Sequence, residues 1–225
     1  MSREPVFTKL VDAAVGGRAD VVSQLLASDR DLATARSDDE CFVDAATHQL
    51  YAGDTALHMA AAAFRRVVAE ILVRSGADSR ARNRRGAEPL HYAADTNHWA
   101  PAAQRETIEY LLSAGADPNA IDNDGTAPLH RAVRTRSSEA VRALLAGGAD
   151  VRRRNGSGST PLHLAVQDTG RGGAGSMRAR NEQLKIVVLL LEAGAKPTDT
   201  DGKGRTVLDA SSRDEIVNML DHRSA

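Results

Sequence analysis

One six-residue motif recurs five times along the chain and limits it to a repeat architecture. Its clearest copy is Gly-Ser-Thr-Pro-Leu-His at residues 158–163, and the other copies begin at residues 53, 86, 125 and 204. A second motif, Gly-Ala-Asp or Gly-Ala-Lys, begins at residues 76, 115, 148 and 194, so one follows each of the first four copies. Two motifs that alternate at a near-constant spacing are typical of a stacked repeat protein.

Each motif has a local structural role. Threonine at the third position is a good helix N-cap, and the proline after it suits the first helical turn, where no N–H is needed. The glycine of the second motif suits the left-handed residue that ends a helix. Two short apolar segments with helical spacing lie between the motifs, for example 161–166 and 184–192. The sequence therefore predicts a unit made of a helix, a turn, a second helix and an extended loop.

This pattern resembles the ankyrin repeat, whose consensus carries Thr-Pro-Leu-His at the start of its first helix and Gly-Ala-Asp after its second. The resemblance covers roughly residues 53–220. It implies an all-α fold, an ankyrin-repeat solenoid of stacked helix-turn-helix units with β-hairpin finger loops. The expected organisation is an N-terminal capping helix pair (1–31), an enlarged finger insert (32–52), four repeats (53–203), and a C-terminal capping repeat with its tail (204–225).

The four repeats are expected at 53–85, 86–124, 125–157 and 158–203. Inserts near 95–101 and 168–180 fall between the two helices of their repeats. We expect Trp99 to fold onto the helix ends, because a Trp ring buries well while its N–H stays solvated. The insert at 168–180 is rich in glycine and arginine, which predicts a flexible basic loop.

Residues 32–52 are longer than an ordinary finger and allow two interpretations. Long loops are commonly variable or mobile, so the first is a partly ordered loop. The second is an enlarged finger that folds over the first repeat or contacts a partner, with Phe42 and Tyr51 as its anchors.

Composition argues against a membrane protein and against internal disulfides. The net charge is −1, which implies no attraction of the whole chain to nucleic acid or membrane. The single cysteine, Cys41, excludes an internal disulfide and suits a reducing compartment. The N-terminus shows no apolar signal region, and the longest apolar run, 186–191, is too short to cross a bilayer. We expect a cytoplasmic monomer without membrane contact.

The sequence offers no metal, cofactor or catalytic site. The motif histidines occur once per repeat, whereas a zinc ion needs ligands about 2 Å away that converge on one point. We expect their rings to bond loop backbone and to tie each helix to a finger; they are His58, His91, His130 and His163. The glycine pattern at 170–175 lacks the strand and helix that a dinucleotide site requires. Cys41 and His48 share one irregular loop with no scaffold to orient them. We therefore expect no cofactor and no enzymatic activity.

The resemblance implies a non-enzymatic protein–protein interaction module, acting as a scaffold or an inhibitor. In the family, target-binding residues lie on finger tips and on exposed positions of the first helix. Carried over by position, they form what we call the predicted strip: Tyr51, Met59, Arg84, Arg85, Tyr92, Asp95, Asn123, Asp124, Arg131, Arg134, Ser157, Leu164 and Gln167.

Arginine clusters at 80–85, 131–136 and 152–154 leave three interpretations of the partner open. The arginines are solvated beside acidic neighbours, they bind an acidic protein, or they bind nucleic acid or another anion. The last is the alternative function, and it is less favoured because interleaved aromatic residues are absent and the charge excess is small.

Overall fold

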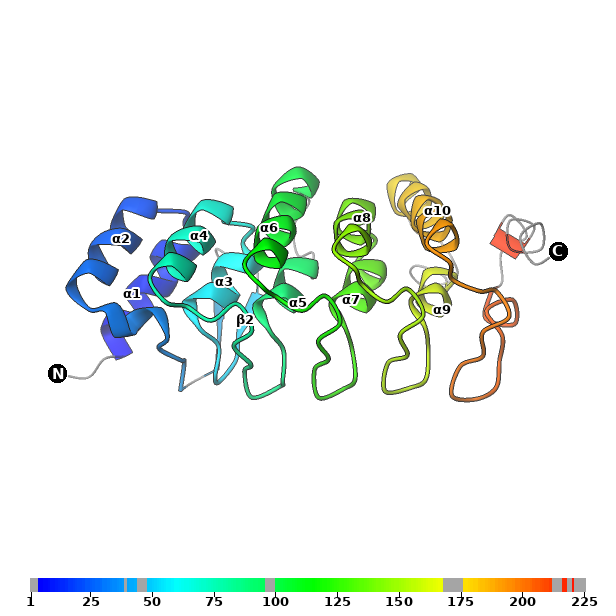
Figure 1. Ribbon diagram of the computed structural model, residues 1–225, viewed down its shortest axis with the longest axis horizontal. Helices are drawn as coiled ribbons and strands as arrows, with labels where there is room; N and C mark the ends of the chain where they lie inside the picture. The colour runs from blue at the N-terminus through cyan, green and yellow to red at the C-terminus, as the bar shows by residue number, and fades with distance from the viewer. Residues whose placement is uncertain are drawn as a thin grey trace.

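The computed structural model describes residues 4–38, 40–43, 48–95, 100–167, 176–211, 216, 217 and 220. Within these ranges, pairs of helices stack side by side in one elongated row, and extended loops project from one side of it (Figure 1). The described part is mostly helical, as an all-α solenoid requires. We call each projecting loop that precedes a first helix a finger.

Each repeat contributes a short first helix and a second helix of equal or greater length. The first helices are α3 (Ala56–Ala62), α5 (Pro89–Ala94), α7 (Pro128–Arg134) and α9 (Pro161–Ala165). The second helices are α4 (Arg66–Arg74), α6 (Pro101–Ser113), α8 (Ser138–Ala146) and α10 (Met177–Glu192). Ahead of them, α1 (Glu4–Val15) packs on α3 and α2 (Ala19–Ser28) packs on α4, while the 3₁₀ turn η1 (Arg30–Ala33) follows α2. The stack thus has an inner row of first helices and an outer row of second helices.

The motif histidines join neighbouring repeats. Nδ1 of His58 accepts a hydrogen bond from the backbone N–H of Thr55 at 3.1 Å, which caps α3. Nε2 of the same ring donates to the carbonyl oxygen of Ala87, in the next finger, at 3.1 Å. His91, His130 and His163 make the same two kinds of bond. The expectation that these rings tie each first helix to a finger is confirmed.

The fifth copy of the motif carries Asp209 in place of histidine. Its Oδ2 accepts from the backbone N–H of Thr206 at 2.8 Å, so the capping half of the pattern is kept. An aspartate carboxylate has no hydrogen to donate onward, so the link to a following finger is absent at this residue.

The turns ahead of the last four motif copies are each closed by an Asn or Asp three residues before the motif glycine, at 83, 122, 155 and 201. In the third repeat, Oδ1 of Asp122 accepts from the N–H groups of Asp124 (3.0 Å) and Thr126 (2.9 Å). Gly125 has a φ of 68°, and a Cβ there would lie 2.8 Å from the backbone nitrogen of Gly156. Only glycine allows both this backbone conformation and this close approach of neighbouring fingers.

The inserts in the second and fourth repeats lengthen the outer helices. α6 has 13 residues and α10 has 16, whereas α4 and α8 have 9 each. Figure 1 shows both longer helices extending beyond their neighbours. The prediction of a loop through residue 180 is therefore wrong at its end, because Ser176 caps α10 and accepts from the N–H of Ala179. Residues 96–99, which include Trp99, and residues 168–175 lie outside the described residues.

The enlarged finger contains a two-stranded antiparallel hairpin. β1 (Cys41–Val43) pairs with β2 (His48–Leu50), with Phe42 opposite Gln49. β2 contacts α3, which places the hairpin against the first helix of the first repeat. This arrangement corresponds to the second interpretation of 32–52, in which the segment folds over the first repeat.

Candidate functional site

A pocket of about 480 Å³ lies where β2 and two fingers meet the first helices α5 and α7. It is lined by residues from three consecutive repeats: His48, Gln49, Tyr51, Asn83, Arg85, Ala87, Tyr92, Asp95, Asp122, Asp124, Thr126, Arg131 and Arg134. Seven of them belong to the predicted strip, namely Tyr51, Arg85, Tyr92, Asp95, Asp124, Arg131 and Arg134. The strip therefore converges on one hollow rather than forming a uniform band.

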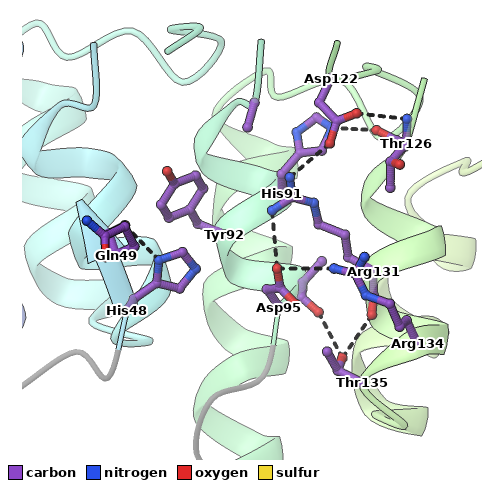
Figure 2. A network of polar contacts seen from close by, with 12 residues as sticks. His48, Gln49, His91, Tyr92, Asp95, Asp122, Thr126, Arg131, Arg134 and Thr135 are labelled. Carbon is purple, nitrogen blue, oxygen red and sulfur yellow. Dashed lines mark hydrogen bonds and ion pairs between the residues drawn. The ribbon is translucent and has the colours of Figure 1, made fainter. Parts of the chain in front are cut away.

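The back of the pocket is a buried hydrogen-bond network around Asp54. Its carboxylate accepts from Tyr92 Oη at 2.7 Å, from Asn83 Nδ2 at 2.8 Å and from the N–H of Tyr51 at 2.7 Å. Burial, reinforced by the Asp54 charge, raises the pKa of Tyr92, so its hydroxyl stays protonated and remains a donor. The His48 ring stacks on the Tyr92 ring with centroids 4.6 Å apart, as Figure 2 shows.

Replacing Asp54 by alanine is expected to lower the free energy of unfolding by about 3 kcal/mol, because three buried donors lose a charged acceptor. Urea unfolding followed by circular dichroism measures the change. Tyr92→Phe, which removes one donor and keeps the ring, is the matched control and should cost about 1–2 kcal/mol. Equal losses in the two variants would contradict a network centred on Asp54.

One wall of the pocket is an ion-pair cluster on α5, α7 and the finger between them. Arg131 donates from Nη2 to Asp122 at 2.9 Å and from Nη1 to Asp95 at 3.2 Å (Figure 2). Arg134 reaches the same Asp95 carboxylate at 3.6 Å. Burial alone would raise the pKa of Asp122, but the bonds from Arg131 and from the N–H of Thr126 outweigh it and lower the pKa. The cluster is thus charged and held in one geometry.

Tyr51 and Arg85 also line the pocket. The Arg85 guanidinium lies over the Tyr51 ring, 4.4 Å from its centroid. Such a contact is a cation–π interaction, and it orients the guanidinium while leaving its edge free to donate hydrogen bonds. Among the described residues, none forms an ion pair with Arg84 or Arg85.

Two residues of the predicted strip are not exposed contact positions. Met59 is 0% exposed, because α3 is covered by α1, α5 and β2, and every residue of this helix is buried. Tyr92 is 1% exposed, since it packs against His48 of the enlarged finger and bonds to Asp54. Both predictions of a direct contact are therefore wrong, because Met59 is enclosed within the stack of first helices and Tyr92 lies under His48.

The remaining strip residues lie outside the pocket. Arg84, Asn123 and Ser157 are exposed on successive finger turns, and Asn123 Nδ2 donates to the carbonyl oxygen of Arg84 at 3.0 Å. Leu164 is half-buried against the core, and Gln167 is exposed after α9. Arg84, Asn123 and Ser157 thus form a row along the finger turns, whereas Leu164 and Gln167 belong to α9 and the residues after it.

Several pocket residues, chiefly Asp122 and His48, were not predicted from the sequence. A signal for Asp122 exists, because Asn or Asp stands three residues before the motif glycine at 83, 122, 155 and 201. Only at 122 does this side chain also hold a first-helix arginine in the pocket wall. His48 has no such signal, since the enlarged finger has no second copy in the chain.

A second buried carboxyl, Glu88, takes the helix-capping position that threonine holds in the first and fourth repeats. The residue is 3% exposed, and its Oε2 has no hydrogen-bond partner among the described residues. Burial raises its pKa to about 7. Above that pH, the protein holds a buried negative charge that is incompletely compensated.

Glu88→Thr is expected to raise the free energy of unfolding by about 1–3 kcal/mol above pH 7. The folded-state pKa of about 7 exceeds the ordinary glutamate pKa of 4.5. Glu88 therefore stabilises the fold below pH 4.5 and loses this contribution as the pH rises through 7. Urea unfolding at both ends of this range measures the gain, which should shrink toward pH 4.5. Thr160→Glu, at the equivalent position, should destabilise; a stabilising effect there would contradict the explanation.

Other kinds of site find no support in the described ranges. Within them, no group of three or more His, Cys, Asp or Glu side chains could hold a metal ion. None of the described helices is both long and apolar enough to cross a membrane.

Comparison with known proteins agrees with the architecture. A family model described as ankyrin repeats (3 copies) matches residues 10–122 and 98–201, which together cover most of the chain. A search of curated proteins gives no match. Stacked helix pairs, histidine-capped first helices and projecting fingers fill the matched region. The chain therefore belongs to the ankyrin-repeat family.

Proposed function

We propose that this protein is a non-enzymatic module that binds another protein through the pocket and the finger turns beside it, as a scaffold or an inhibitor. Ankyrin repeats are generally protein–protein interaction modules. The observation that carries the proposal is the pocket itself, to which three consecutive repeats contribute side chains. We further propose that it acts as a cytoplasmic monomer, in keeping with its single cysteine and modest net charge.

The chemistry of the pocket supports a protein partner. Arginine and tyrosine are enriched among the residues that dominate binding energy at interfaces, and both are present here as Arg85, Arg134 and Tyr51. The Arg131 ion pairs and the Asp54 network hold the pocket in shape, so little ordering entropy is lost on binding. Exposed residues on the neighbouring finger turns can supply a polar rim.

The arginine clusters give the alternative, nucleic-acid binding, no specific support. Arg80 pairs with Asp117 at 3.2 Å and Arg152 pairs with Asp199 at 2.6 Å, both across neighbouring fingers. These carboxylates offset the positive charge that a phosphate chain would need.

The test is affinity capture from native lysate with three forms of the protein. The pocket variant carries Arg84→Ala, Arg85→Ala and Arg134→Ala, which leaves the buried Arg131 in place. The control variant carries Arg66→Ala, Arg74→Ala and Arg142→Ala, three exposed arginines on second helices. We expect a protein captured by the wild type and the control but lost from the pocket variant, with binary binding verified by calorimetry on purified partners. Identical captures by all three forms would contradict the proposal.

A further inference from the structure

We propose that the pocket selects an acidic segment of its protein partner, whose carboxylate accepts hydrogen bonds from Arg85 and Arg134. This inference rests on the proposed function and specifies the chemistry of the partner.

The pocket is lined by three arginines and three aspartates, but they are not equally available. Arg131 is 14% exposed and spends both terminal nitrogens on Asp95 and Asp122. Those two carboxylates are largely covered as well, and both accept hydrogen bonds from Arg131. This cluster is therefore a structural wall with little capacity for an external ion.

The two other arginines retain donors. Arg134 is 61% exposed, and its ion pair with Asp95, at 3.6 Å, is longer than the 3.2 Å bond that Arg131 makes to the same oxygen. Arg85 is held by the Tyr51 ring and, among the described residues, has no carboxylate partner. Two guanidinium groups thus face the same pocket with hydrogen-bond donors to spare, and their planar forks match the two oxygens of a carboxylate.

The same surface is unsuited to a nucleic-acid strand. Asp124, exposed on the finger at the pocket rim, would repel a continuous row of phosphates. The Tyr51 face is covered by Arg85, so it offers no stacking platform for a base. A single carboxylate needs neither a continuous row of positive charges nor an exposed aromatic face.

Selection of displayed random peptides on the full-length protein tests the inference. We expect the enriched peptides to share Asp or Glu residues and to lose about tenfold in affinity with Arg85→Ala or Arg134→Ala. Arg66→Ala, on the outer row, should leave their affinity unchanged. Arg134→Glu should shift the selection toward Lys and Arg. Thermal melts of each variant establish that it is folded.

The outcomes separate this inference from the proposed function. Enriched peptides that lack acidic residues but still weaken with Asp124→Ala or Arg85→Ala would overturn the acidic partner and keep the pocket as a protein-binding site. Peptides insensitive to every pocket substitution would overturn both. Displacement of the selected peptides by a thymidine oligonucleotide at physiological salt would show that the pocket binds polyanions without preference, which overturns the inference.

Discussion

Acidification from pH 6.5 to pH 4 is expected to lower the free energy of unfolding. Burial lowers the pKa of His91 from 6.5 to about 4, and it also lowers the pKa values of His58 and His130. These imidazoles are neutral in the fold, with Nδ1 accepting and Nε2 donating. Protonating Nδ1 would place a hydrogen against the N–H that caps the helix, so the folded state resists it.

The direction of this change in the free energy of unfolding follows from the linkage between proton binding and folding. A folded-state pKa below the unfolded value gives stability that is complete above pH 6.5 and is lost as the pH falls through 4. His91 alone accounts for about 3 kcal/mol, and His58 and His130 add losses of the same sign. Glu88 works in the opposite direction, because it takes up a proton in the fold as the pH falls through 7. Urea unfolding at a series of pH values measures the net loss.

His91→Gln is the matched variant, because a glutamine side chain can both accept and donate but does not titrate. Its free energy of unfolding should fall less steeply between pH 6.5 and pH 4 than that of the wild type. The free energy of unfolding of Glu88→Thr should fall more steeply over this range, because the variant lacks the opposing contribution of Glu88. Parallel pH profiles for wild type and His91→Gln would show that His91 does not carry the acid sensitivity.

Leu129→Ala is expected to lower the free energy of unfolding by about 2–5 kcal/mol. Leu129 is fully buried in α7, in the middle of the row, and α7 packs against α5, α8 and α9. In a solenoid each unit is stabilised by its neighbours, so a cavity here weakens interfaces on both sides. Chemical denaturation measures the loss.

Val67→Ala provides the control for that experiment. Val67 is 56% exposed on α4, so its truncation should change stability by less than about 0.5 kcal/mol. A mild effect of Leu129→Ala, similar to that of the control, would mean that the motif leucine does not face the core and that the repeat register is wrong.

The repeat architecture could be predicted from sequence because its determinants are local and occur several times. Threonine is the N-cap residue of two of the four first helices, proline follows the N-cap at three of the four, and glycine allows the finger turns to meet. Even the role of the motif histidines followed from their one-per-repeat spacing. Repetition turns weak local signals into a strong one.

The site was predicted less well because its shape depends on a segment without repetition. Met59 and Tyr92 hold positions that the family exposes, yet both are buried here, and His48 of the enlarged finger stacks on Tyr92. The side-chain partners of Arg131 lie 9 and 36 residues away, on a finger and on the previous first helix, and nothing in the local sequence marks Asp95 and Asp122 as a pair. The positions of residues within the motif indicated where the pocket lies. Burial and ion pairing decide which of those residues are available to a partner.

The unequal repeat lengths have a consequence for anything that lies along the fingers. Extra residues enter the outer row, as the 13 and 16 residues of α6 and α10 show, while each histidine still ties its helix to the next finger by a bond of 3.0–3.2 Å. Each finger therefore keeps the same bond to the preceding first helix, although the second helices behind the finger row differ in length. The second helices can differ in length from repeat to repeat without breaking the bonds that fix the positions of the fingers.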